Sequence, residues 1–172
     1  RQIYKIYNLK MKYIKYFVQF LFAILSFMIF KILGPSLSSK LSGKIFKLIG
    51  PFFRPKDIIH SNIKRGIPNI SSENLDKIAN LMWSNYGNVF AEFMFLKNFR
   101  YGNLSSKIQV DGQDILDAIK KSNKQVIFIS GHFCNFELMA MYLEKTGINL
   151  ATIYRPLNNF FLNLSYKLSK AK

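Results

Sequence analysis

The chain has 172 residues, 49% of them hydrophobic, and carries 25 Lys and Arg against 9 Asp and Glu. This length and apolar content suit one domain of ordinary size with a buried core. The single cysteine, Cys134, excludes an internal disulfide and any metal site that needs several cysteines. The net charge of +16 attracts nucleic acid or an anionic membrane surface. Because a long apolar segment accompanies this charge and no nucleic-acid-binding motif is found, the membrane is favoured.

A basic stretch up to Lys15 leads into an apolar segment over residues 16–33. As a helix, this segment would be about 27 Å long, just enough for the hydrocarbon core of a bilayer. We expect an uncleaved membrane anchor, with a signal peptide and a buried helix of a soluble domain as the alternatives. Basic residues flank the segment on both sides, so the positive-inside rule does not fix its orientation.

Gly34 and Pro35 end the apolar segment, and residues 36–49 follow with an amphipathic helical pattern. Apolar and basic side chains alternate on it with helical spacing: Leu37, Leu41, Ile45 and Leu48 against Lys40, Lys44 and Lys47. Two interpretations stay open. The helix lies on anionic lipid headgroups, or it packs on its own domain and leaves its lysines in solvent.

Two more helices are expected in the next fifty residues. Residues 54–68 form a short helical pattern that ends at Gly66 and Pro68. The next helix starts at a cap from Ser71 or Ser72, and it runs on or restarts through residues 89–96.

Glu92 is a lone acid among Phe90, Phe93, Met94 and Phe95. It is interpreted either as a contact to substrate or as a hydrogen-bonded, partly buried carboxylate. The second interpretation is the more frequent case for an acid in such surroundings.

From residue 107 on, short apolar runs alternate with helical patterns. The expected strands are residues 107–110, 126–130 and 149–153, and the expected helices begin after the caps Asp111 and Asn135 and near Asn159, with Gly147 closing the second. Strands that alternate with helices predict βαβ units and a parallel sheet.

The predicted fold class is therefore α/β. An N-terminal membrane-anchoring and amphipathic region, residues 1–50, leads into a parallel-sheet catalytic domain, residues 51–172.

His132 and Glu137 both follow the carboxyl end of a predicted parallel strand, where open α/β sheets bind their ligands. Residues five apart on one helix point about 140° apart. The pair therefore meets only if His132 lies in the turn that Gly131 permits and Glu137 in the first turn of the next helix.

A carboxylate bound to one imidazole nitrogen fixes the tautomer and raises the basicity of the ring, so that the other nitrogen can take a proton from a hydroxyl. Such a pair suits the activation of a substrate alcohol for direct attack. By spacing alone, a structural histidine is the more frequent case. One His and one Glu are too few ligands for a zinc site.

Two segments, SGHFCNFE at residues 130–137 and YRPLNN at residues 154–159, together resemble the lipid A biosynthesis acyltransferases. These are the late lauroyl or myristoyl-type enzymes of the glycerolipid acyltransferase-like superfamily, whose hallmark is a histidine, four residues and an acid. The resemblance extends from the N-terminal apolar segment through Glu92 to the second of these segments. It implies that His132 is the general base and Glu137 its partner in a catalytic dyad.

Two positions depart from the family pattern: Cys134 stands where the family usually has Gly, and Phe136 where it usually has Trp. A thioester on Cys134 is disfavoured, because acyl transfer in the family is direct. The C-terminal portion of the family is missing, so the chain is expected to be a fragment.

Arg155 follows the third predicted strand, where its guanidinium can bind a phosphate or an oxyanion. The alternative is a structural arginine held by a carboxylate or by the backbone. We expect Arg155, Tyr154, Asn135 and Asn158 to bind substrate.

The resemblance further implies acyl carrier protein as the donor, a lipid A precursor as the acceptor, and no cofactor or metal. It places the protein at the inner membrane, with its catalytic part on the cytoplasmic face. A basic surface suits both an acidic carrier protein and a phosphorylated lipid. The alternatives are an acyltransferase for another phospholipid or glycolipid, and a non-catalytic membrane-binding protein.

Overall fold

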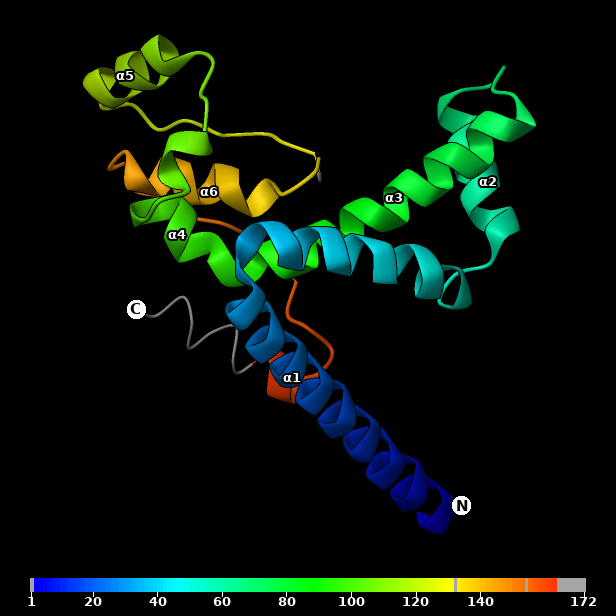
Figure 1. The fold of residues 1–172 in the computed structure, drawn as a ribbon. Coiled ribbons are helices and arrows are strands. Elements are labelled where there is room, and N and C mark those ends of the chain that lie inside the picture. The colour runs from blue at the N-terminus through cyan, green and yellow to red at the C-terminus, as the bar shows by residue number, and fades with distance from the viewer. Residues whose placement is uncertain (1, 132, 154, 164–172) are drawn as a thin grey trace. The chain divides into compact units, whose positions relative to one another are not determined.

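The computed structural model describes residues 2–131, 133–153 and 155–163, with side chains from Met11 onward. These residues are helical or irregular, and none of them belongs to a β-strand (Figure 1). The chain divides into two compact units. The first unit combines residues 1–32 with residues 151–172, and the second comprises residues 33–150. These units do not test the predicted domains, residues 1–50 and 51–172, which stay a prediction.

α1 (Gln2–Ile49) is interrupted at Gly34, whose φ of 75° and ψ of 171° are not helical. Two neighbouring residues explain the break. Pro35 disfavours a helical conformation in the residue before it, and a glycine takes a positive φ without a Cβ clash. The predicted end of the apolar segment at Gly34 is confirmed. We call residues 11–33 the anchor segment and residues 36–49 the amphipathic segment.

The anchor segment is largely exposed, with Phe22 at 62% and Ile32 at 85% of their full accessibility. Within the described residues, one helix is long and apolar enough to cross a membrane, and its most apolar stretch is only 11% buried. This low burial argues against the alternative of a core helix in a soluble domain, which would be mostly buried.

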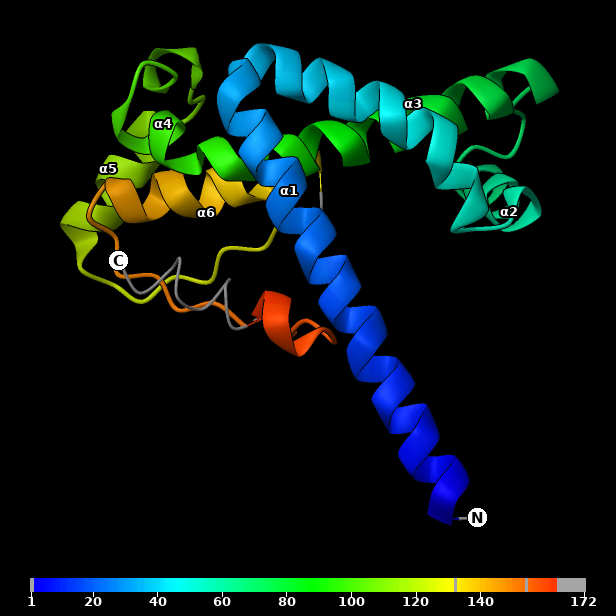
Figure 2. The ribbon, with the colours of Figure 1, turned by 60° about the horizontal axis from the view of Figure 1, so that its bottom comes forward.

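Residues 151–163 return to the anchor segment within the first unit (Figure 2). The side-chain amide of Asn159 donates to the backbone oxygen of Tyr16 at 2.8 Å and to the side-chain oxygen of Gln19 at 3.2 Å. The ring centroid of Phe161 lies 5.6 Å from that of Phe17. The helix predicted near Asn159 is present over the described residues 160–163.

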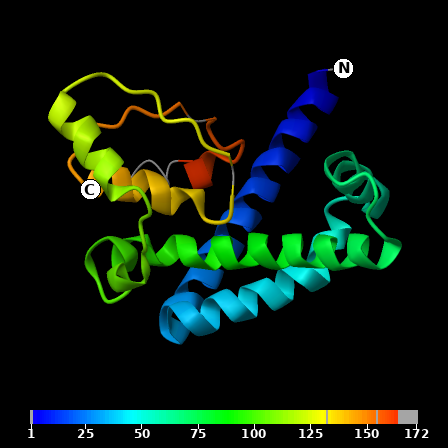
Figure 3. The ribbon, with the colours of Figure 1, turned by 90° about the horizontal axis from the view of Figure 1, so that it is seen from above.

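α3 (Ser72–Glu92) and the amphipathic segment run side by side in the second unit (Figure 3). Small residues make this close approach possible. Ser38 and Ser42 are buried, and a Cβ added to Gly87 would lie 2.3 Å from the backbone oxygen of Ser42. Of the two interpretations of the amphipathic segment, packing on its own domain is therefore confirmed for this face.

Ser71 is the N-cap of α3, and its hydroxyl accepts a hydrogen bond from the backbone N–H of Asn74 at 3.3 Å. This confirms the predicted cap. A 3-10 turn, η1 (Gly50–Phe52), joins α1 to α2 (Lys56–Gly66). The short helix predicted over residues 54–68 is thereby confirmed.

α2 packs on the first half of α3. The Lys56 ammonium lies 2.7 Å from Oδ1 of Asp76, and Nε2 of His60 lies 3.1 Å from the same oxygen. Hydrogen bonding to Lys56 lowers the pKa of Asp76. Ile59 and Leu75 are buried in this part of the unit.

The elements after α3 are η2 (Phe93–Phe95), α4 (Leu96–Tyr101), η3 (Ser105–Lys107), α5 (Gln113–Ser122) and α6 (Phe136–Lys145). Polar contacts bind α6 to its neighbours. Arg100 of α4 donates to Glu144, which raises the pKa of Arg100. The Tyr142 hydroxyl donates to the side-chain oxygen of Gln113 at 2.8 Å.

The predicted parallel sheet is wrong. Residues 107–110 begin in η3, and residues 126–130 and 149–153 are irregular. Ile127 and Ile129 are 88% and 93% exposed, whereas a parallel strand is covered on both faces. A short apolar run becomes a strand only when a neighbouring strand supplies hydrogen bonds, and the period of the run does not identify that neighbour. The described fold is helical, not α/β.

The caps predicted in this region have mixed outcomes. The residue that caps α5 is Gly112, with a φ of 83° and no side-chain cap, so the prediction of Asp111 is wrong by one position. Gly147 has a φ of 86°, and its N–H donates to the backbone oxygen of Glu144 at 2.9 Å. It ends α6 as predicted.

Candidate functional site

His132 lies outside the described residues, so its contact with Glu137 stays a prediction. Glu137 is half-buried in the first turn of α6, where the sequence predicted it. Acidic side chains are favoured in the first turn of a helix, where backbone N–H groups have no partner within the helix.

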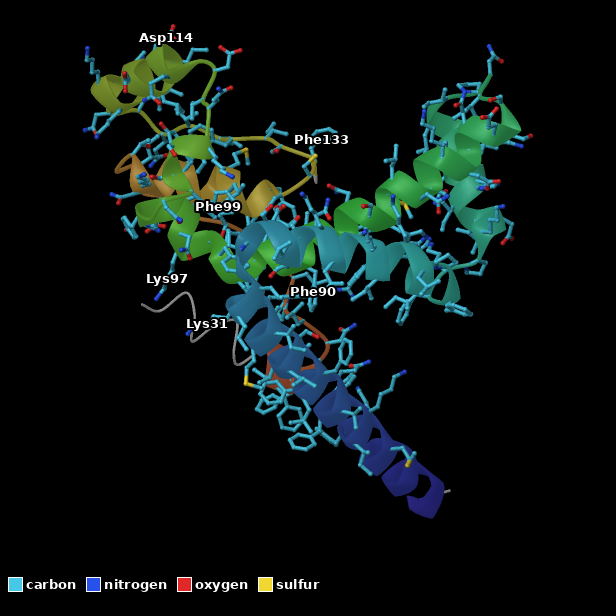
Figure 4. The ribbon with its side chains drawn as sticks, viewed as in Figure 1. Lys31, Phe90, Lys97, Phe99, Asp114 and Phe133 are labelled. Atoms are coloured by element: carbon cyan, nitrogen blue, oxygen red, sulfur yellow. The ribbon has the colours of Figure 1, made fainter. Side chains whose placement is uncertain are left out.

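The turn before α6 has an uncommon backbone conformation. Cys134 has a φ of 45°, in the left-handed region that glycine occupies readily and other residues rarely. The Cys134 thiol is exposed. Phe133, 80% exposed, projects from the end of the connection that leads into α6 (Figure 4). The position that usually carries glycine in the resembling family is thus one where the backbone favours glycine.

Glu92, in the last turn of α3, joins three parts of the second unit. One carboxylate oxygen accepts a hydrogen bond from the Ser39 hydroxyl at 3.0 Å. The other accepts one from the side-chain amide of Asn135 at 3.1 Å. Glu92 is half-buried, so the interpretation as a hydrogen-bonded, partly buried carboxylate is confirmed.

Asn135 precedes α6 as predicted, but its side chain makes no capping hydrogen bond to the helix. The side-chain amide donates to Glu92 instead. Asn135 therefore fastens the turn that follows His132 to the end of α3. Its proposed contact with substrate is not tested.

Sequence reasoning did not single out Ser39, the third member of this group. The only feature of the sequence that points to Ser39 is its place in a group of small polar residues on the amphipathic segment, with Ser38 and Ser42. Such a pattern predicts a close helix contact but does not identify the acid that Ser39 binds, because that acid is 53 residues away in the chain.

Arg155 and Asn158 belong to the first compact unit, where both are exposed. Tyr154 lies outside the described residues. The sheet edge that was expected to gather these residues beside Glu137 is missing from the described part of the chain. Their roles in binding substrate stay predictions.

Asn159 has a structural role that the sequence analysis did not assign. It is 6% exposed, and its side-chain oxygen accepts the backbone N–H groups of Phe161 and Leu162 at 3.1 and 3.3 Å. The signal was available, because asparagine at the start of a helical pattern is a favoured N-cap.

Comparisons with curated proteins and with solved structures gave no significant match. A model of the bacterial lipid A biosynthesis acyltransferases matches residues 5–168, which is nearly the whole chain. The matched range includes Glu92, Glu137 and both segments that carry the resemblance. The chain therefore belongs to the bacterial lipid A biosynthesis acyltransferase family.

Proposed function

We propose that this protein moves a fatty acyl chain from acyl carrier protein to a hydroxyl group of a lipid A precursor, at the cytoplasmic face of the inner membrane. The observation that carries the proposal is the family match over residues 5–168, which assigns an acyltransferase of lipid A biosynthesis. The donor, the acceptor, the catalytic residues and the side of the membrane are the proposed additions.

In the proposed reaction, His132 takes the proton of the acceptor hydroxyl, and the oxygen attacks the thioester carbonyl of the donor. The tetrahedral intermediate collapses when the carbon–sulfur bond breaks. The proton then passes from His132 to the departing thiolate. The products are an ester on the acceptor and a free thiol on the carrier protein.

Glu137 is proposed to orient His132 and to stabilise the imidazolium that forms during the transfer. Its place in the first turn of α6 supports this role, because it puts the carboxylate five residues after His132 at the start of the helix that follows the turn. Arg155 is proposed to bind a phosphate of the acceptor or the oxyanion of the intermediate.

The proposed location is supported by the anchor segment, which is exposed, apolar and long enough to span a bilayer. The net charge of +16 adds attraction to anionic lipids and to an acidic carrier protein.

The test is an acyl-transfer assay on the full-length protein in membranes, with labelled acyl carrier protein and several acceptors separated by thin-layer chromatography. The acceptors are a lipid A precursor, a glycerophospholipid and an unrelated glycolipid. We expect product only with the lipid A precursor. Product with another acceptor alone would reassign the substrate, and no product with any would refute the proposed reaction.

His132→Ala is expected to lower the transfer rate about a hundredfold to ten-thousandfold, the usual contribution of a general base. Membrane association should not change, because the anchor segment is untouched. His60→Ala is the matched control, since His60 is the other histidine of the chain and contacts Asp76 of α3. Equal activity of the two variants would refute the role of His132.

A further inference from the structure

The amphipathic segment has two unlike faces. One face packs on α3 through Ser38, Ser42 and Gly43, all of them buried. The surface turned away from α3 carries four large aliphatic side chains that are each at least 40% exposed: Leu37, Leu41, Ile45 and Leu48. We call these four residues the apolar stripe.

The apolar stripe is continuous, and a row of lysines lies along it. At about 100° per residue, the four stripe residues fall within about 80° of one another around the helix. By the same geometry Lys40, Lys44 and Lys47 occupy the next 60° or so, on the side away from Ser38 and Ser42. All three lysines are exposed.

Two exposed aromatic side chains follow the stripe in the chain. Phe52 and Phe53, 87% and 76% exposed, follow the end of α1, and Arg54 comes directly after them. Single exposed hydrophobic residues are normal on a protein surface, but a row of this length marks a contact site.

The charge around the stripe selects the partner. Asp57 is the first acidic residue of the chain, and the 56 residues before it contain 11 Lys and Arg. A surface that combines aliphatic side chains with lysines and lacks acids is complementary to anionic lipid, since the aliphatic chains enter the acyl layer and the ammonium groups reach the phosphates.

We infer that the apolar stripe lies on an anionic lipid surface, with its lysine row at the level of the lipid phosphates. The inference rests on the proposed membrane location but does not require acyl transfer. It adds to the anchor segment a second lipid contact, made by the second unit, which contains Glu92, Asn135 and Glu137 of the candidate site.

The opposite edge of the same helix is bound to the candidate site. Ser39 donates to Glu92, and Glu92 accepts from Asn135, which stands three residues after His132. Two hydrogen bonds therefore connect a helix that rests on lipid with the turn that carries the proposed base. This arrangement would hold the turn close to the surface that presents a lipid acceptor.

The experiment uses the full-length protein in vesicles, with Cys134 replaced by Ser and one new cysteine for an environment-sensitive fluorophore. The test positions are Leu41→Cys and Leu48→Cys. Ile115→Cys on α5 is the matched control, because Ile115 is an aliphatic residue of similar exposure outside the stripe. Phe22→Cys reports separately on the anchor segment.

In vesicles that contain anionic lipid, labels at Leu41 and Leu48 should shift to shorter wavelength, lose intensity to shallow nitroxide lipids and resist aqueous iodide. The label at Ile115 should keep its emission wavelength, keep its intensity with nitroxide lipids and be quenched by aqueous iodide. Neutral vesicles, or replacement of Lys40, Lys44 and Lys47 by Gln, should weaken the quenching by nitroxide lipids at Leu48 but not at Phe22.

Equal iodide quenching at Leu48 and Ile115 would overturn the inference. Protection of Leu48 from both quenchers would also overturn it, because protein and not lipid would then cover the stripe. Quenching by nitroxide lipids at Leu48 without any at Phe22 would support the stripe and refute the anchor, so the two failures are distinguishable.

Discussion

At the scale of single residues, Glu92 connects more of the candidate site than any residue that the sequence placed there. It lies in the last turn of α3 and accepts from Ser39 and from Asn135. Neither partner is near it in the sequence. A carboxylate fits this place because it only accepts hydrogen bonds, and both neighbours donate.

Glu92→Gln should therefore disturb the site although it keeps the size of the side chain. The amide oxygen can still accept from Asn135, but the NH₂ group faces the Ser39 hydroxyl, which must turn from donor to acceptor, and both hydrogen bonds lose the charge of the carboxylate. We expect the free energy of unfolding to fall by about 1–3 kcal/mol, measured by chemical denaturation in detergent. Acyl transfer should fall with it.

A double-mutant cycle separates this contact from general damage. Glu92→Gln and Asn135→Ala should show a coupling energy of about 0.5–3 kcal/mol, whereas Glu92→Gln and Gly66→Ala should be additive. Additivity in the first pair would show that the contact with Asn135 contributes nothing.

At Cys134, in contrast, a substitution is expected to raise the free energy of unfolding. Its φ of 45° is unfavourable for a residue with a Cβ. Cys134→Gly should therefore raise the free energy of unfolding by up to about 1 kcal/mol, the strain relief less the added freedom of the unfolded chain. Cys134→Val should lower it, because a β-branched residue tolerates this conformation poorly. Thermal unfolding of the three proteins is the measurement.

The same variant tests the chemistry of the thiol. In direct acyl transfer, Cys134→Gly should keep its activity in the transfer assay. A loss comparable to that of His132→Ala would instead indicate a covalent acyl-cysteine intermediate.

At the scale of elements, the contact between the amphipathic segment and α3 depends on residues without bulk. A Cβ at Gly87 would lie 2.3 Å from the backbone oxygen of Ser42 and 2.8 Å from Cα of Gly43. Backbone atoms cannot move aside as the end of a side chain can, so the two helices would have to separate.

Gly87→Ala should cost about 1–3 kcal/mol of stability, the usual range for overpacking a well-packed contact. Gly66→Ala is the control, since a Cβ there meets nothing within 4 Å. Equal stability of Gly87→Ala and the wild type in a denaturation series would refute the close approach.

The pairing of α2 with α3 should respond to pH. Because Lys56 lowers the pKa of Asp76 below its usual 3.8, the folded state favours the ionised acid. The stability gained in this way is present above pH 3.8 and is lost as the pH falls through the folded value. Asp76→Asn and Lys56→Gln should each remove part of the stability difference between pH 6 and pH 3, measured by thermal unfolding. Identical pH profiles for all three proteins would contradict the contact.

Features of the fold that depend on residues close together in the chain could be predicted from the sequence, and features that depend on distant residues could not. The Ser71 cap, the break at Gly34 and the glycine at residue 147 depend on atoms a few residues apart, and all three were predictable. The strand predicted over residues 126–130 required a neighbouring strand from another part of the chain, and the apolar run does not specify that neighbour. For the same reason the sequence does not predict the contact between Glu92 and Asn135, which are 43 residues apart.

At the scale of the whole molecule, the family match and the charge distribution both favour an environment of anionic lipid. The 56 residues before Asp57 hold 11 basic and no acidic side chains, so most of the net charge of +16 lies in and around α1. The rest of the chain contains all nine acids, among them Glu92 and Glu137 of the candidate site. This distribution of charge is what the proposed contact of the N-terminal region with anionic lipid requires.

In the proposed membrane location, the break at Gly34 sets the length of helix that a bilayer has to accommodate. A straight helix of 48 residues, the extent of α1, would measure about 72 Å, more than twice the hydrocarbon thickness of a membrane. Interruption at Gly34 leaves about 27 Å for residues 16–33. If the protein spans the membrane as proposed, the thickness of the bilayer constrains the residues before Gly34, whereas packing against α3 constrains the residues after it. Insertions on the two sides of this glycine would be limited by different physical requirements.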